Sequence, residues 1–150
     1  MKAENHRRKA ENIENSLKLL REVDWEMKIE AAMLAGTHWA NYTLHRSGLS
    51  SDSEDIVHNS MLVVNMLRKY SLAEGELLGA LTEIEELRPF YVRGDLPDGS
   101  RAAERALAML NSIRALACRS RSPLCRRVSS REGCRARDDR RISQSNVSGN

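Results

Sequence analysis

The spacing of apolar residues is the feature that most constrains the fold, because they recur every three or four positions in five successive segments. This period matches the 3.6-residue turn of an α-helix, so each segment is expected to form a helix with one apolar face. Strands are not indicated, because β-branched residues are few and aromatic residues make up only 4% of the chain. Since short links between amphipathic helices make neighbours antiparallel, we predict an all-α, antiparallel bundle of four to five helices.

The first two helices can be placed from their apolar patterns and terminal residues. The second should begin after Asp24, a good N-cap, and end near Gly48, a common helix-stop residue. It is apolar around most of its circumference, which predicts contacts on more than one side. The first helix is expected over residues 3–23, with an N-terminal turn that projects or frays, and with a narrow seam made of Ala3, His6, Ala10, Ile13, Leu17 and Leu20.

Capping pairs mark the later helices. Ser51 and Glu54 have capping-box spacing and predict a third helix from residue 51 or 52, and Ser71 and Glu74 predict a fourth that ends before Pro89. Ser100 can cap a fifth helix. Within the fourth helix, Gly75 and Gly79 form a G-x-x-x-G pattern that predicts close helix packing.

The charge distribution divides the chain into two regions. Residues 1–118 carry 15 basic and 18 acidic residues, a net charge of −3, whereas residues 119–150 carry nine arginines and three acids, a net charge of +6. The second region also holds seven serines and has no apolar period, so we expect a helical bundle over 1–118 and a disordered basic tail over 119–150. Two interpretations of the tail stay open: an RNA-binding segment, or a solvated extension read past a stop codon or out of frame.

Targeting and cysteine patterns predict a cytoplasmic protein with free thiols. The charged N-terminus is not followed by an apolar run, so no signal peptide is indicated, and the longest nearly uncharged run is too short for a membrane span. No membrane association is therefore expected. Cys118, Cys125 and Cys134 match no common zinc spacing and have no histidine nearby.

The segment LAGTHWANYTLHRSG, residues 34–48, carries the most distinctive polar residues. At 100° per residue, His38, Asn41 and His45 fall on one line with Leu34, opposite the main apolar arc of the second helix. We call His38, Asn41 and His45 the histidine ridge. The ridge is interpreted either as a polar or interfacial surface, such as a dimer seam, or as the lining of a shallow groove whose histidines titrate near neutral pH.

A metal site is not predicted by these spacings. A site made of His38, His45 and His58 would need the polar faces of two helices to turn toward each other. The Glu-x-x-His pattern of di-iron bundles is also absent, although Asp55 and His58 have that spacing once. We therefore expect no metal and no cofactor.

The segment RPFYVRG, residues 88–94, is predicted to be a loop. Arg88 and Arg93 flank Phe90 and Tyr91, a combination that can hold a phosphate while an aromatic ring stacks on a base. The alternative is that the two rings cap the open end of the bundle.

The second helix, AAMLAGTHWANYTLHRSGL, followed by a polar turn and a further amphipathic segment, resembles the HEPN superfamily of small helical bundles. The resemblance covers at most residues 24–118. Catalytic HEPN proteins are ribonucleases with an arginine followed four to six residues later by a histidine, and this chain has no such pair, because Arg46 and His58 are too far apart. The resemblance therefore implies a non-catalytic member that acts as a dimer or as the partner of another protein.

The sequence as a whole predicts a non-catalytic, cytoplasmic interaction protein that self-associates or binds a protein partner, with nucleic acid as a second partner through the tail. No G-x-S-x-G, Walker A or dinucleotide-binding glycine pattern is present. Two alternatives stay open: an enzyme of the ribonuclease type that uses His38, His45 or His58 as general acid or base, and a metal- or ligand-binding bundle.

Overall fold

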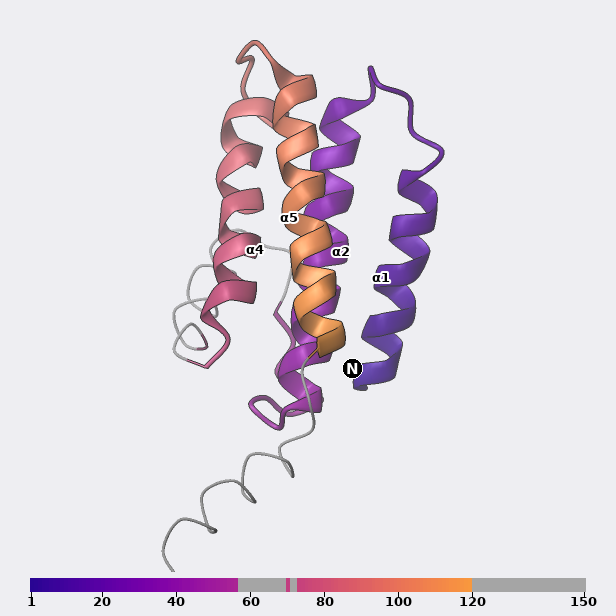
Figure 1. Cartoon of the computed structure of the whole chain (residues 1–150), viewed down its shortest axis with the longest axis vertical. Helices are drawn as coiled ribbons and strands as arrows, with labels where there is room; N and C mark the ends of the chain where they lie inside the picture. The colour runs from indigo at the N-terminus through magenta and orange to yellow at the C-terminus, as the bar shows by residue number, and fades with distance from the viewer. Residues whose placement is uncertain (57–69, 71–72, 120–150) are drawn as a thin grey trace, which may run out of the picture.

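The computed structural model describes residues 1–56, 70 and 73–119, and over these ranges the chain is all-α, without a strand. It forms four α-helices and one π-helical turn (Figure 1). Their bounds are α1 Ala3–Leu17, α2 Trp25–Arg46, α4 Gly75–Leu87, η1 Arg88–Val92 and α5 Gly99–Arg119. The predicted all-α bundle is thus confirmed, whereas the basic tail beyond residue 119 and most of the predicted third helix lie outside the described residues.

Helix α2 occupies the centre of the bundle. It packs against α1, α4 and α5, and every residue from Ala35 to Leu44 is buried. Helices α1 and α2 are antiparallel, as are α4 and α5, whereas α2 and α5 run in the same direction (Figure 1). The apolar circumference of α2 therefore reflects a helix with neighbours on several sides, as the sequence predicted.

The close approach of helices occurs at Gly36 of α2, not at the glycines of α4. A Cβ atom at Gly36 would lie 3.0 Å from Leu81 Cδ1 and 3.2 Å from Ile113 Cδ1, whereas Gly75 and Gly79 are exposed and a Cβ atom there would meet no described residue within 4 Å. The prediction of close packing through Gly75 and Gly79 was wrong. A residue without a side chain is needed at Gly36 because α4 and α5 both pack against α2 at this point.

Helix α1 ends six residues earlier than predicted, at Leu17 rather than Val23. The amide of Leu19 donates to the carbonyl of Ser16, three residues back, and the helix does not continue. The side chains beyond this point bury little, since Leu19 is 84% and Val23 70% exposed, so continued winding would add no apolar contact. The N-terminal turn, predicted to project, is instead held by His6, which is buried.

Two other segments differ from prediction. Residues 51–56 form a turn and irregular chain, although Glu54 does accept hydrogen bonds from the amide and the hydroxyl of Ser51. The capping pair therefore closes a turn here, and the third helix does not begin at residue 51 or 52. Helix α4 does end before Pro89, as predicted, but residues 88–92, which were predicted to be part of a loop, form the π-helical turn η1, with Pro89 in its first turn.

No helix among the described residues is long and apolar enough to cross a membrane. The core is formed by the predicted faces of α2, α4 and α5, with side chains such as Trp39, Leu81 and Ile113 almost fully buried.

Candidate metal centre

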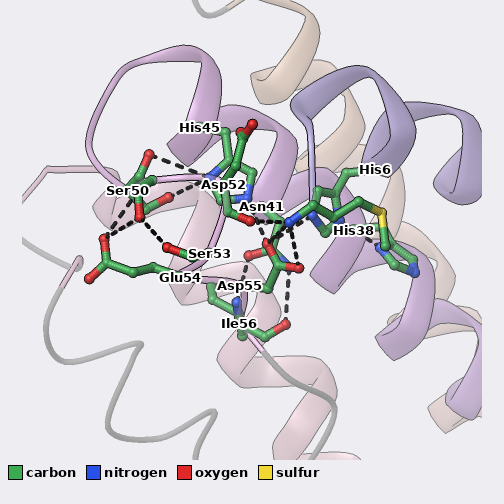
Figure 2. A network of polar contacts seen from close by, with 12 residues as sticks. His6, His38, Asn41, His45, Ser50, Asp52, Ser53, Glu54, Asp55 and Ile56 are labelled. Carbon is green, nitrogen blue, oxygen red and sulfur yellow. Dashed lines mark hydrogen bonds and ion pairs between the residues drawn. The ribbon is translucent and has the colours of Figure 1, made fainter.

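The histidine ridge of α2 lies inside the fold rather than on its surface. His38 is 7% and Asn41 1% exposed, and the His45 side chain is 2% exposed. Helix α1 and the segment after α2 cover the ridge (Figure 2). The ridge therefore cannot serve as an external dimer seam in this conformation, and its polar groups are satisfied within the chain.

Helix α1 contributes His6 to this region. The seam predicted on α1 does face the bundle: His6 and Ala10 are buried, and Ala3, Ile13 and Leu17 pack against the core. His6 occupies the second seam position of α1, after Ala3, and its ring contacts those of His38 and His45 at centroid distances of 5.1 and 5.2 Å.

The segment after α2 contributes Asp55, and Asn41 fixes the position of this segment. The Asn41 side-chain amide donates to the carbonyl of Ile56 at 3.0 Å, and the Ile56 amide donates to Asn41 Oδ1 at 2.7 Å. The chain reverses through Gly48, whose φ of +72° is a left-handed conformation that suits glycine. Asn41 thus acts as a backbone clamp that places Asp55 over the ridge (Figure 2).

The Asp55 carboxylate is the centre of the cluster. Its Oδ1 lies 2.8 Å from His45 Nε2 and 3.1 Å from His6 Nε2, and the α-amino group of Met1 donates to the carboxylate at 3.1 Å. Asp55 is 28% exposed, whereas both imidazoles are 2% exposed. We call His6, His45 and Asp55 the triad; its ligand-type atoms all lie within 4.8 Å of one another.

The other nitrogen of each imidazole also has a partner. His6 Nδ1 lies 2.9 Å from His38 Nδ1, and His45 Nδ1 lies 2.8 Å from the hydroxyl of Ser50. Each of these two partners can donate or accept a hydrogen bond. Because both Nε2 atoms face a carboxylate, the metal-free cluster has Nε2–H donating to Asp55 and Nδ1 accepting from His38 or Ser50.

Burial and hydrogen bonding set the charge state of the cluster. Burial lowers the pKa of His6 below its usual 6.5, against the opposing effect of the hydrogen bond to Asp55. Burial alone would raise the pKa of Asp55, but hydrogen bonds from His45, the Met1 amine and His6 outweigh it, so this pKa lies below 3.8. At neutral pH the cluster therefore contains an ionised carboxylate and a neutral His6.

These shifts predict acid sensitivity of the fold. Because the pKa of His6 is lower in the folded than in the unfolded chain, the unfolded chain binds more protons below pH 6.5, and stability falls as the pH drops through this region. Protonation of Asp55 lowers the stability of the fold further below pH 3.8. The urea midpoint should thus be lower at about pH 5.5 than at about pH 7.5, and the difference should shrink in His6→Asn. Equal midpoints for the unsubstituted chain would contradict this assignment.

A cavity of about 530 Å³ opens beside the cluster. His6 and Asp55 line it together with His38 and Asn41, whereas His45 does not. The triad therefore stands at the wall of a space that a small molecule can enter.

The predicted RPFYVRG site is not assembled as a phosphate and base site. Arg88 is engaged by two carboxylates, with its Nε donating to Glu30 at 2.9 Å and its Nη1 to Glu85 at 2.7 Å. Phe90 is 56% exposed and Arg93 is exposed, whereas Tyr91 is partly buried against the core. The position of Tyr91 therefore agrees with the alternative that the rings cap the end of the bundle, and the charge of Arg88 is neutralised by Glu30 and Glu85.

Two members of the triad were not singled out from the sequence. His6 was assigned to the seam of the first helix. The sequence feature that could have identified it is a histidine within this otherwise apolar seam, which faces a helix that carries two histidines. Asp55 was paired with His58 on a polar helix face, but residues 51–56 are not helical and His58 lies outside the described residues. The clamp by Asn41 that places Asp55 depends on a contact between residues 15 positions apart, which no local pattern encodes.

Comparisons with known proteins found no matching family model, no matching curated protein and no matching solved structure, so the functional argument rests on the geometry.

Proposed function

We propose that this protein binds one divalent transition-metal ion through His6 Nε2, His45 Nε2 and the Asp55 carboxylate. The observation that carries the proposal is the convergence of two buried imidazoles on one carboxylate from three separate segments of the chain. Two histidines and one carboxylate are a recurrent ligand set for zinc and for non-haem iron. This proposal develops the metal-binding alternative and departs from the expectation that the chain holds no metal.

The distances within the triad suit an ion. Two ligands of one tetrahedral zinc ion lie about 3.3 to 3.4 Å apart. The two imidazoles are 2.8 and 3.1 Å from the carboxylate oxygen, and no pair of triad atoms exceeds 4.8 Å. Side-chain adjustments of at most about 1.5 Å would therefore bring all three into coordination.

The surrounding hydrogen bonds also suit an ion. A metal-bound imidazole needs an unprotonated Nε2 and usually donates its Nδ1–H to an acceptor, which fixes the ring. His38 Nδ1 and Ser50 Oγ stand at those two positions and can change from donor to acceptor. Metal binding then requires a change of tautomer at His6 and His45, and the low pKa of His6 means that little free energy is spent on removing a proton at neutral pH.

Isothermal titration calorimetry with zinc chloride tests the proposal directly. The full chain should carry a histidine-free tag at its C-terminal end and the substitutions Cys118→Ser, Cys125→Ser and Cys134→Ser, because thiolates would bind zinc independently. In this thiol-free background we expect one zinc ion per chain.

The matched comparison is the double variant His6→Asn and His45→Asn in the same background, with circular dichroism to verify that it is folded. We expect this variant to lose the stoichiometric binding. Absence of zinc, cobalt and iron(II) binding by the folded, thiol-free chain would overturn the proposal, as would equal binding by the double variant.

The prediction of a self-associating or partner-binding protein rests on the sequence alone, as does the resemblance to the HEPN superfamily. Burial of the histidine ridge rules out the dimer seam that was one interpretation of this ridge. Light scattering of the metal-free and zinc-loaded chain distinguishes a monomer from a dimer and tests this prediction independently of the metal site.

A further inference from the structure

The cavity beside the triad has the size of a small-molecule site. Its volume of about 530 Å³ lies within the range of about 300 to 1,000 Å³ that such sites occupy. Helix α1, helix α2 and the segment around Asp55 each contribute part of its wall.

The position of the triad relative to the cavity decides where a ligand could reach the ion. His6 and Asp55 line the cavity, whereas His45 does not and therefore lies on the side of the triad away from it. Zinc held by three protein groups keeps at least one coordination position for water or another ligand. An ion in the triad would direct that position toward the cavity.

The cavity lining selects for the chemistry of that ligand. Ile13, Leu34 and Ile56 provide an apolar wall, and Asp55 is the one acidic residue among the described residues of the lining. Lys9 lies at the exposed rim and forms no ion pair within the described part of the chain. A divalent ion with a single carboxylate ligand keeps a net positive charge, and Lys9 adds to it, so an anion with an apolar body fits best.

We infer that the cavity binds a small organic carboxylate, whose carboxylate group occupies the open coordination position of the ion while its apolar body packs on Ile13, Leu34 and Ile56. This inference rests on the proposed metal site.

Cobalt(II) substitution tests it, because the visible absorption of Co²⁺ responds to its ligands. Hexanoate added to the Co²⁺-loaded, thiol-free full chain is expected to change this absorption in a saturable way. It should bind at least about tenfold more tightly than acetate, because four additional methylene groups are buried. Pentylamine, which has the same five-carbon apolar body and a cationic group in place of the carboxylate at neutral pH, should leave the spectrum unchanged.

Two pairs of variants separate the cavity from the ion. Leu34→Trp fills the cavity and should weaken hexanoate binding at least about tenfold with Co²⁺ binding retained, whereas Met27→Trp, on an exposed part of α2 outside the lining, should not. Lys9→Gln should weaken hexanoate binding by about twofold to fivefold, whereas Lys18→Gln, outside the lining of the cavity, should not.

The outcomes distinguish the two proposals. Failure of the chain to bind Co²⁺ overturns the metal site and the carboxylate site together. A Co²⁺ spectrum that ignores hexanoate and acetate overturns the carboxylate site alone. Equal affinities for hexanoate and acetate, unaffected by Leu34→Trp, would show coordination from solvent and would overturn the role assigned to the cavity.

Discussion

Replacing Asp55 by asparagine is expected to weaken zinc binding by at least about 100-fold. Changes to groups that only orient metal ligands typically cost about 10- to 100-fold in affinity, and Asp55 would contact the ion itself. Asparagine has almost the same size and its side-chain oxygen can still accept hydrogen bonds from His6 and His45, so the fold should persist. Competition for zinc with a chromophoric chelator, in the thiol-free background, gives the affinity ratio.

Asp52→Asn is the matched control for this experiment. Asp52 lies in the same segment, its side chain is exposed, and it is not a member of the triad. Only its backbone carbonyl takes part, by accepting a hydrogen bond from the Met1 amine. We expect an affinity within about twofold of the unsubstituted chain. Similar effects of both substitutions would mean that the loss reflects the general charge of the segment rather than coordination by Asp55.

Replacing Trp39 by alanine should lower the free energy of unfolding by about 3 to 5 kcal/mol, the usual cost of removing a buried tryptophan. Trp39 is 1% exposed, its ring meets Tyr42 edge-on at a centroid distance of 5.8 Å, and its indole N–H donates to Glu14 at 2.5 Å. The substitution leaves a large cavity and removes the donor from a carboxylate that also pairs with Arg114. Urea denaturation followed by circular dichroism measures the change.

Trp25→Ala removes the same side chain from a partly buried position and serves as the control. Trp25 packs at the start of α2 against Gly99, where a Cβ atom would lie only 2.4 Å from the indole ring. We expect a smaller loss in the free energy of unfolding, about 1 to 2 kcal/mol, because Trp25 buries less apolar area than Trp39. A loss for Trp39→Ala no larger than that for Trp25→Ala would contradict the deeper burial of Trp39 in the core.

The fold could be predicted where the information is local. The apolar faces of α4 and α5 and the large arc on α2 follow directly from residue spacing, and Leu77, Leu81 and Ile113 are buried on these faces. Errors arose where the outcome depends on neighbours: α1 stops at Leu17 because the helices beside it offer nothing for Leu19 and Val23 to contact, and Gly36 is the tight point because two helices converge on it.

The candidate site could be predicted only in part, for the same reason. The wheel of α2 correctly aligned His38, Asn41 and His45 and allowed either an interfacial surface or the lining of a groove, because nothing local indicates that α1 lies over them; His38 and Asn41 line the cavity. His6 and Asp55 reach this line from positions 32 and 10 residues away from His38 and His45, respectively. Their role follows from packing between helices, which periodicity within each helix does not encode.

Two polar side chains of α1, those of His6 and Glu14, determine how this helix is aligned along the bundle. Its seam buries only one small apolar residue fully, Ala10, so apolar contact alone would tolerate a shift by one helical turn. His6 and Glu14, eight residues apart, each meet a partner at one position only: His6 at the ridge, and Glu14 between Trp39 and Arg114. A shift of α1 by one turn would separate both groups from these partners, so these contacts favour one register, as a buried polar residue does in a coiled coil.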